Sequence, residues 1–505
     1  MLDFDSCYRA VTSRDSRFDG RFFTGVTSTG IYCRPICPAR TPARRNVRFF
    51  PAAAAAEGAG FRPCKRCRPE ASPGSPDWDV RGDLIGRALR LIDDGLVDEQ
   101  GVRGLARRLA VTERHLHRLF VAELGAPPLA VARNRRLQLA RRLLTETAIP
   151  VTDVAFASGF GSVRQFNASM RESYGQAPSE LRGVGHGTGR PAALELRLAV
   201  RSPYDHGALL AFLAARAIPG VEEVTAGRYV RTVAAPGGTA VPDGAHAMTI
   251  ELIPAGDHVL LRAGGPGPRG VAPLVARCRR LFDLDADPWA VRDVLARDPL
   301  LAPLVDAHPG LRMPGAFDGF ELAIRAVLGQ QISVAAASTL AGRLVARCGT
   351  PLPETGEDGG PSHLFPTAAQ VAAADLSGLG LTGARRRTLE ALAGAVAAGE
   401  IDLDGGADPA ETADRLLALP GVGPWTVSYI AMRALGDPDA LPVADLALRR
   451  AFAALAPAGR NPARRNPADQ NPAGQSLADR AEDWRPWRAY AAMHLWTSLT
   501  ERNRS

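Results

Sequence analysis

Hydrophobic and polar positions change their periodicity twice along the chain. Between 80 and 182, apolar residues recur at helical spacing in short runs that are separated by glycine turns. From 193 to 200 apolar and polar residues alternate, which predicts a β-strand. Further strands are predicted at 229–233, 248–252 and 258–261, and a helix near 207–217. From about 287 to the end the pattern is helical again.

Proline, glycine and low-complexity runs separate these regions. Breaker stretches lie at 72–76 and 183–191, and three Asn-Pro-Ala repeats within 457–476 predict a disordered surface insertion. We therefore expect a multidomain α+β protein with domains at 1–75, 80–183, 191–308 and 309–505. No apolar run reaches the roughly 18 residues of a membrane span. The first residues lack the features of a signal peptide, which predicts a cytoplasmic protein.

Positive charge is concentrated in the first 185 residues. The whole chain carries a net charge of +8; residues 1–75 hold 13 basic and 6 acidic residues, and 76–185 hold 16 and 13. Residues 186–505 hold 32 basic and 34 acidic residues. A basic excess favours a polyanionic partner such as DNA, with a solvated basic surface as the alternative. Lys65 is the only lysine, so nearly all of this charge is arginine.

Four of the seven cysteines form two short-spaced pairs. Cys33 and Cys37 enclose three residues, 26 residues follow, and Cys64 and Cys67 enclose two residues. Two such pairs can surround one ion tetrahedrally, and four thiolates select zinc. The spacing alone is typical of a structural zinc site, so we expect one Zn²⁺ bound by all four cysteines.

The residues around these cysteines add a chemical role. Segments 29–40 (Thr-Gly-Ile-Tyr-Cys-Arg-Pro-Ile-Cys-Pro-Ala-Arg) and 60–69 (Gly-Phe-Arg-Pro-Cys-Lys-Arg-Cys-Arg-Pro) resemble the N-terminal domain of the Ada DNA-repair proteins. The resemblance covers about 5–70. It implies that the first cysteine, Cys33, accepts a methyl group from a methylated DNA phosphotriester while bound to zinc. The family's other methyl acceptor needs a Pro-Cys-His site, which this sequence lacks.

Two similar helix-turn-helix units follow, at 102–120 and 151–170, joined by a helix at 134–144. Thr112 and Ser162 are placed to cap the second helix of each unit. Segments 160–166 and 174–182 resemble the AraC-family DNA-binding domain, and the likeness extends over about 82–182. It implies that each second helix enters the major groove of promoter DNA, with RNA polymerase as a further partner. The predicted DNA-contacting residues are Glu113, Arg114, His115 and Arg118, then Val163, Arg164, Gln165 and Asn167.

Residues 419–426 (Leu-Pro-Gly-Val-Gly-Pro-Trp-Thr) fit a helix-hairpin-helix, in which backbone N–H groups of Gly421 and Gly423 grip a DNA phosphate. The motif alone is common to many helix turns. Its context is more specific: Asp445 follows Gly423 by twenty-two residues, in a proline-containing loop before a helix. Segments 279–285, 309–315, 320–334 and 484–496 complete a resemblance to AlkA, the 3-methyladenine DNA glycosylase II family, across about 192–500.

This resemblance implies the fold and chemistry of the second half. It predicts an antiparallel α+β domain followed by an all-α helix-hairpin-helix glycosylase domain. Asp445 would stabilise the sugar cation as an alkylated base leaves. Trp425, Tyr429 and Trp496 occupy the base-pocket positions, and Gln331 replaces the family's apolar wedge. No lysine lies in 186–505 to form a Schiff base, which predicts base excision without strand cleavage.

Three functions fit these patterns. The first is a nucleoid-associated repair enzyme and regulator in one chain, which joins a DNA-3-methyladenine glycosylase, a suicidal methyl acceptor and an AraC-type activator of the adaptive response. The second is a transcriptional regulator whose glycosylase part only senses damage. The third is a DNA-binding zinc protein without chemistry. Asp445 and its aromatic neighbours favour the first.

Overall fold

The computed structural model describes most of the chain, which folds as two compact units. The described residues are 3–15, 18, 22–37, 39–64, 66–67, 69, 83–182, 193–234, 247–264, 270–352, 360–404, 406–455 and 476–502. Unit 1 comprises 1–201, 233–279 and 284–286, and unit 2 comprises 202–232, 280–283 and 287–505. Lys65, the breakers at 72–76 and 183–191, and all but the last residue of 457–476 lie outside the described residues.

A small sheet at the start of unit 1 carries the paired cysteines. Its order is β3-β1-β2-β4, with β1 antiparallel to β2 and β3, and β2 parallel to β4. A side chain on Gly25 would lie 2.7 Å from the Phe50 ring, so glycine lets that ring close over β1. The elements are α1 (Phe4–Ser13), β1 (Phe23–Val26), β2 (Ile31–Cys33), β3 (Val47–Phe50), α2 (Ala53–Gly58) and β4 (Arg62–Pro63).

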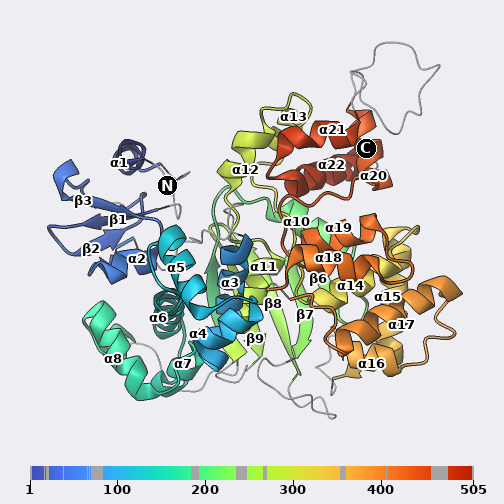
Figure 1. The fold of residues 1–505 in the computed structure, drawn as a ribbon, viewed down its shortest axis with the longest axis horizontal. Helices are drawn as coiled ribbons and strands as arrows, with labels where there is room; N and C mark the ends of the chain where they lie inside the picture. Colours follow the sequence, from blue (N-terminus) through green and yellow to red (C-terminus); the bar gives the residue numbers. More distant parts are fainter. Residues whose placement is uncertain are drawn as a thin grey trace. The chain divides into compact units, whose positions relative to one another are not determined.

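The helices that come next in the chain confirm the double helix-turn-helix (Figure 1). They are α3 (Asp83–Asp93), α4 (Leu96–Arg108), α5 (Glu113–Leu124), α6 (Pro128–Glu146), α7 (Val151–Ala157), α8 (Val163–Tyr174) and α9 (Pro178–Arg182). Thr112 accepts a hydrogen bond from the His115 N–H, and Ser162 accepts one from the Gln165 N–H, each at 3.2 Å. Both predicted caps are therefore in place.

The cysteine-bearing sheet and the first helix-turn-helix share one hydrophobic core. Tyr32, Phe61 and Ala56 pack in the same buried cluster as Leu116 and Phe120 of α5. Both parts bury apolar surface in this one cluster, so the stability of each depends on the other. A change that unfolds the small sheet therefore also removes packing partners of α5, the helix predicted to contact DNA.

Three antiparallel strands follow in unit 1. Strand β9 (His258–Gly264) pairs with β5 (Ala193–Ala199) and with β8 (Ala247–Ala255). Leu194, Leu196 and Leu198 are buried, as the alternating pattern predicts for one face of a half-buried sheet. Helix α11 (Val271–Leu281) comes next in the chain.

Unit 2 is mainly helical (Figure 1). Helices α14 (Gly319–Leu328), α15 (Val334–Cys348), α16 (Ala368–Ala373), α17 (Gly383–Ala397), α18 (Pro409–Leu417) and α19 (Pro424–Arg433) form one bundle with a continuous core. Helices α20 (Leu446–Ala454) and α13 (Ala302–Ala307) pack on α22 (Arg488–Arg502), with α12 (Pro288–Leu295) beside α13. The unit also holds α10 (His206–Ala214), α21 (Leu477–Ala481), β6 (Glu222–Thr225) and the part of β7 (Arg228–Ala234) up to Thr232, which pairs with β6 as a hairpin.

Four elements differ from the predicted pattern. Strand β6 escapes prediction because Glu222 and Glu223 interrupt its apolar alternation. Helix α11 begins before the predicted onset of helical structure at 287. Within the helical region, β10 (Thr350–Pro351) and β11 (His363–Leu364) pair as a two-residue ladder. None of the described helices is long and apolar enough to cross a membrane.

Candidate functional sites

The four predicted cysteines converge on one point of unit 1. Cys33 ends β2 and Cys64 follows β4, so the parallel pairing of these strands places the two side by side. The Cys64 N–H donates to the Tyr32 carbonyl oxygen at 3.0 Å. Cys37 lies in the turn after β2, and the Arg34 N–H donates to the Cys67 sulfur at 3.4 Å. The four sulfur atoms all lie within 4.8 Å of one another.

This geometry fits a tetrahedral zinc ion. Sulfur atoms at about 2.3 Å from zinc are roughly 3.8 Å apart, which the cluster reaches with small movements. Hydrogen bonds with Cys33 and Cys67 lower the pKa of Cys37, whereas hydrogen bonds with Cys37 and Cys67 raise the pKa of Cys33. Four sulfurs this close cannot all ionise unless a cation compensates their charge. Cys64 and Cys67 are buried, whereas Cys33 and Cys37 are half-buried and reachable from solvent.

The predicted DNA-contacting residues lie on the outer faces of α5 and α8. Glu113, Arg114, His115 and Arg118 are exposed, as are Arg164 and Gln165, while Val163 and Asn167 are half-buried. Leu116 and Phe120 of α5, and Phe166 and Met170 of α8, point into the core. The helical period therefore separates an apolar inner face from a polar outer face on both helices.

In unit 2, three donors converge on the carboxylate of Asp445, which caps α20. Its Oδ1 accepts from the Leu448 N–H at 2.9 Å and from Trp496 Nε1 at 3.2 Å. Its Oδ2 accepts from Trp425 Nε1 at 2.9 Å. Helices α20, α19 and α22 each supply one donor, and together they fix this half-buried carboxylate.

The same indoles belong to an aromatic cluster beside this carboxylate. Trp425 and Tyr429, one helical turn apart on α19, stack at 5.4 Å with an interplanar angle of 11°. Tyr429 meets Trp496 at 6.3 Å and 61°, and Trp496 lies 6.4 Å from Phe212 of α10. The structure therefore brings together the three predicted aromatics and Asp445, and adds Phe212.

Two arginines stand behind the aromatic cluster. Arg433 donates to the Tyr429 hydroxyl at 2.9 Å and to the carbonyl oxygens of Pro314 and Gly315 at 2.8 and 3.0 Å. The Arg216 guanidinium lies 3.7 Å from the centroid of the Phe212 ring. Burial favours the neutral phenol, but the charges of Arg433 and Arg216 outweigh it and lower the pKa of Tyr429.

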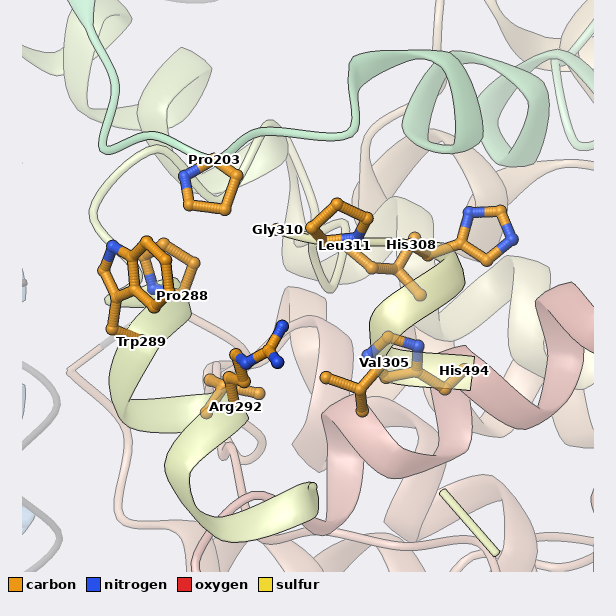
Figure 2. A pocket seen from close by; sticks show the side chains of 11 residues that line it. Pro203, Pro288, Trp289, Arg292, Val305, His308, Gly310, Leu311 and His494 are labelled. Atoms are coloured by element: carbon orange, nitrogen blue, oxygen red, sulfur yellow. The ribbon is translucent and has the colours of Figure 1, made fainter. Parts of the chain in front are cut away.

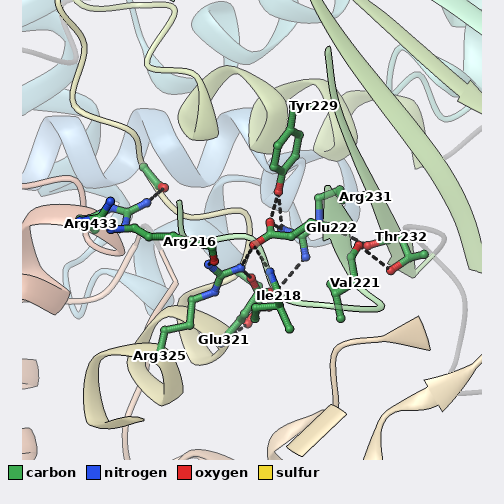
Figure 3. Close-up of polar contacts among 12 residues, drawn as sticks. Arg216, Ile218, Val221, Glu222, Tyr229, Arg231, Thr232, Glu321, Arg325 and Arg433 are labelled. Atoms are coloured by element: carbon green, nitrogen blue, oxygen red, sulfur yellow. Dashed lines mark hydrogen bonds and ion pairs between the residues drawn. The ribbon is translucent and has the colours of Figure 1, made fainter. Parts of the chain in front are cut away.

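A buried network of ion pairs holds the segment of Arg216 in place (Figure 3). Arg231 donates to Glu321 at 2.7 Å, Arg325 pairs with Glu321 at 2.9 Å and with Glu222, and Arg325 donates to the Arg216 carbonyl oxygen at 3.0 Å. Burial raises the pKa of Glu321, yet the charges of Arg231 and Arg325 outweigh it and lower that pKa. Each buried carboxylate is thus compensated, which keeps the strand β6 and the Arg216 segment together.

The helix-hairpin-helix lies between α18 and α19. Gly421 has a φ of +79°, and a side chain there would lie 2.2 Å from the Thr388 hydroxyl of α17. Both features require glycine. Gly423 precedes Pro424, the first residue of α19. Gln331 is exposed in the turn between α14 and α15 with a φ of +58°. Among the described residues it makes no hydrogen bond or ring contact with the aromatic cluster.

A small cavity in unit 2 lies apart from these residues (Figure 2). His494 of α22 is 3% exposed, and its Nδ1 has no partner among the described residues. His308 contacts Asp205 at 2.8 Å and Glu501 at 3.0 Å. The lining residues are Pro203, Pro288, Trp289, Val291, Arg292, Val305, His308, Pro309, Gly310, Leu311 and His494.

The two histidines predict opposite pH effects on the stability of unit 2. Burial lowers the pKa of His494 to about 3, whereas hydrogen bonds to Asp205 and Glu501 outweigh burial and raise that of His308. His494 therefore stabilises the fold above pH ~6.5 and loses this contribution as the pH falls, by about 2 kcal/mol at pH 5. His308 stabilises below pH ~6.5 and loses its contribution as the pH rises through its folded pKa.

Urea unfolding followed by tryptophan fluorescence checks this, since five of the six tryptophans lie beyond 287. Between pH 7.5 and 5, His494→Gln is expected to lose less stability than the wild type. His308→Gln, the matched control, is expected to lose more. Equal slopes for all three proteins would contradict the assignment.

Comparisons with known proteins match all four parts of the chain. Residues 6–70 match the metal binding domain of Ada, and 105–183 match a helix-turn-helix domain. Residues 195–318 match the AlkA N-terminal domain, and 324–468 match the HhH-GPD superfamily of base excision DNA repair proteins. The limits of the four domains themselves stay a prediction.

One relative spans the whole arrangement. The probable bifunctional transcriptional activator/DNA repair enzyme AlkA of Mycobacterium tuberculosis is 48% identical over 503 residues, covering 98% of this chain and 97% of the relative. The chain belongs to this family. DNA-3-methyladenine glycosylase 2 of Escherichia coli is 34% identical over 58% of this chain and 94% of its own length. The Ada protein of that organism is 35% identical over 36% of this chain and 50% of its own length.

As a member of the bifunctional AlkA family, the chain joins an Ada-type zinc and regulator part to an AlkA-type repair glycosylase. The fold class and the family resemblances expected from the sequence are confirmed. The neighbours of the aromatic cluster that the sequence did not predict are Phe212, Arg216 and Arg433. Arg433 alone had a local signal, because it lies one turn after Tyr429 on the same helix.

Proposed function

We propose that unit 2 hydrolyses the N-glycosidic bond of alkylated bases such as 3-methyladenine and 7-methylguanine in double-stranded DNA. The observation that carries this proposal is the Asp445 carboxylate, held by two indole N–H groups of the aromatic cluster. A carboxylate fixed beside flat aromatic faces suits a reaction in which a cationic base departs and the sugar becomes positively charged.

Each part of the cluster has a role in this reaction. An alkylated purine reaches the site only after it is flipped out of the stack. Its electron-poor ring then stacks on Trp425, Tyr429 or Trp496. Alkylation at N3 or N7 makes the base a better leaving group, and Asp445 stabilises the developing oxocarbenium charge and orients or deprotonates water. Gly421 and Gly423 offer backbone N–H groups to a phosphate of the bound strand.

Strand cleavage is not expected to accompany base release. A glycosylase that cuts the strand through a Schiff base uses an amine, and 186–505 contains no lysine. Wild-type protein is therefore expected to free 3-methyladenine and 7-methylguanine from methylated DNA and to leave intact abasic strands. Chromatography of the bases and a denaturing gel measure both results. A borohydride-trapped adduct on unit 2 would overturn the monofunctional reaction, and absence of free base would favour a damage sensor.

Cys33 is proposed as the methyl acceptor of the zinc cluster. One zinc ion, held by Cys33, Cys37, Cys64 and Cys67, would keep the sulfurs as thiolates, the nucleophilic form. The Cys33 sulfur then forms a bond to the methyl carbon of a phosphotriester, the C–O bond breaks, and the phosphodiester leaves with its negative charge. Its half-buried position favours this role over the buried Cys64 and Cys67. Peptide mass spectrometry is expected to find one methyl group on the Cys33 peptide after exposure to methylated DNA.

Methyl transfer also supplies a signal for the helix-turn-helix. A Zn²⁺ with four thiolates carries a net charge of −2, and a thioether in place of one thiolate leaves −1. DNA phosphates are then repelled less, which strengthens binding through α5 and α8. Arg114, His115, Arg118, Arg164, Gln165 and Asn167 are the proposed contacts to promoter DNA. Activation of transcription makes RNA polymerase the further partner.

Trp425→Phe separates stacking from carboxylate positioning. Phenylalanine keeps an aromatic face but removes the Nε1–H bond to Asp445. A charge-assisted hydrogen bond contributes roughly 1.5–3 kcal/mol, so single-turnover base release is expected to fall about 10- to 100-fold. Trp425→Ala is expected to fall further because it also loses the ring. Wild-type rates for Trp425→Phe would contradict the positioning role of this indole.

A further inference from the structure

One side chain ties the turn between α14 and α15 to the helix-hairpin-helix. Gln330 Nε2 donates to the Gly421 carbonyl oxygen at 3.0 Å and to the Thr426 hydroxyl at 2.9 Å. Both amide hydrogens are thereby used. Gly421 lies at the hairpin, and Thr426 is buried in α19 directly after Trp425. The exposed Gln331 therefore lies next to a residue that is fixed on the hairpin.

The main chain of this turn is held from a third element. Arg385 of α17 donates to the Gln330 carbonyl oxygen. Helix α17 also carries Thr388, whose hydroxyl fits against Gly421 only because that residue has no side chain. The turn, α17 and the hairpin thus meet around Gln330, which is bonded through both its side chain and its backbone.

The Gln331 backbone shows what this arrangement fixes. Its φ of +58° lies in the left-handed region, which is unfavourable for a residue with a side chain. Such a conformation persists where the surroundings determine it. Here the backbone is fixed immediately before Gln331. Gln330 is bonded to Gly421 and Thr426, and Arg385 is bonded to the turn.

We propose that Gln330 is a positioning residue. It holds the side chain of Gln331, the tip of the turn between α14 and α15, at a fixed position relative to the helix-hairpin-helix. A DNA strand whose phosphate is bound by the hairpin then meets Gln331 at a fixed distance along the strand. Insertion of Gln331 into the gap that the flipped base leaves costs little further conformational entropy, because the turn is already ordered. Arg385 supports the same position through the Gln330 carbonyl. The inference rests on the proposed glycosylase function. Within that function, Gln330 couples phosphate binding by the hairpin to displacement of the base by Gln331.

The test uses the full chain and a duplex with one tetrahydrofuran abasic analogue opposite 2-aminopurine. This probe reports unstacking by fluorescence and requires no bond cleavage. Gln330→Met keeps the length of the side chain but removes both donors. Loss of two hydrogen bonds is expected to weaken binding to this duplex about tenfold and to reduce the fluorescence change, with intact-duplex affinity and the melting temperature unchanged. Arg386→Ala, on the neighbouring position of α17, is the matched control and is expected to bind as the wild type does.

A double-mutant cycle distinguishes positioning from a general structural role. Gln331→Ala is expected to weaken probe binding in the wild-type background and to add almost nothing in the Gln330→Met background, because the tip is already unplaced. Independent, multiplicative effects of the two substitutions would overturn the proposal, as would wild-type probe binding by Gln330→Met. Failure of base release by the wild type would reject the glycosylase function, whereas these binding readouts would still decide the role of Gln330.

Discussion

Asp445→Asn is expected to lower the single-turnover rate of 3-methyladenine release at least about a thousandfold. The substitution keeps the shape of the side chain but removes the negative charge that faces the sugar cation, and preorganised charge of this kind is worth several kcal/mol. It also turns one acceptor oxygen into an amide donor that opposes an indole N–H of Trp425 or Trp496. Excision kinetics on methylated DNA measure the change.

Asp408→Asn provides the matched control for this result. Asp408 caps α18 as Asp445 caps α20, accepting from the N–H groups of Ala410 and Glu411 at 3.1 and 3.0 Å. Asparagine caps helices about as well as aspartate, so both variants are expected to fold with nearly wild-type melting temperatures. Loss of base release by both, or by neither, would remove Asp445 from its catalytic role.

Cys64→Ser is expected to abolish zinc binding and to weaken specific DNA binding by the helix-turn-helix at least about a hundredfold. Structural zinc contributes on the order of 10 kcal/mol to the folding of small domains. Because the cysteine-bearing sheet shares a core with α5, its loss also removes packing from Leu116 and Phe120. Base release is expected to persist, since Asp445 and its donors all belong to the other compact unit.

Metal analysis and promoter-binding titrations measure these effects in the same preparation. Cys348→Ser is the control, because Cys348 lies outside the cluster and its sulfur already donates to the Leu344 carbonyl oxygen, a bond that serine can keep. Full zinc content in Cys64→Ser would contradict the four-cysteine site. Wild-type promoter binding by a zinc-free protein would contradict the shared core as the link between the two parts.

Local sequence signals predicted the parts of the fold that depend on neighbouring residues. The caps Thr112 and Ser162 were predictable because a helix start needs a side-chain acceptor at one position. Strand β5 was predictable from alternation, and the cysteine cluster from spacing, since both are geometric consequences of nearby sequence. The juxtaposition of Asp445 with Trp425 and Trp496 followed from the family resemblance and not from periodicity.

The rest of the site depends on contacts between distant segments. Phe212 and Arg216 reach the aromatic cluster from a segment more than 200 residues before α19, and no local pattern marks them. Strand β6 carries Glu222 in the interior, where Arg325, Arg231, the Tyr229 hydroxyl and the Ile218 N–H compensate its buried carboxylate. Gln330 resembles any polar residue in a turn until its bonds to Gly421 and Thr426 are seen. Tertiary pairing, not propensity, determines these three features.

We propose that one chain both removes alkylated bases and accepts methyl groups from the DNA backbone. The most direct test incubates full-length protein with DNA carrying tritiated methyl groups, then separates free bases from labelled protein. We predict that the wild type yields both products, with the protein label on the Cys33 peptide, and that Asp445→Asn keeps that label but releases no bases. Wild-type protein that takes up label yet frees no methylated base would contradict the combination of both reactions in one chain.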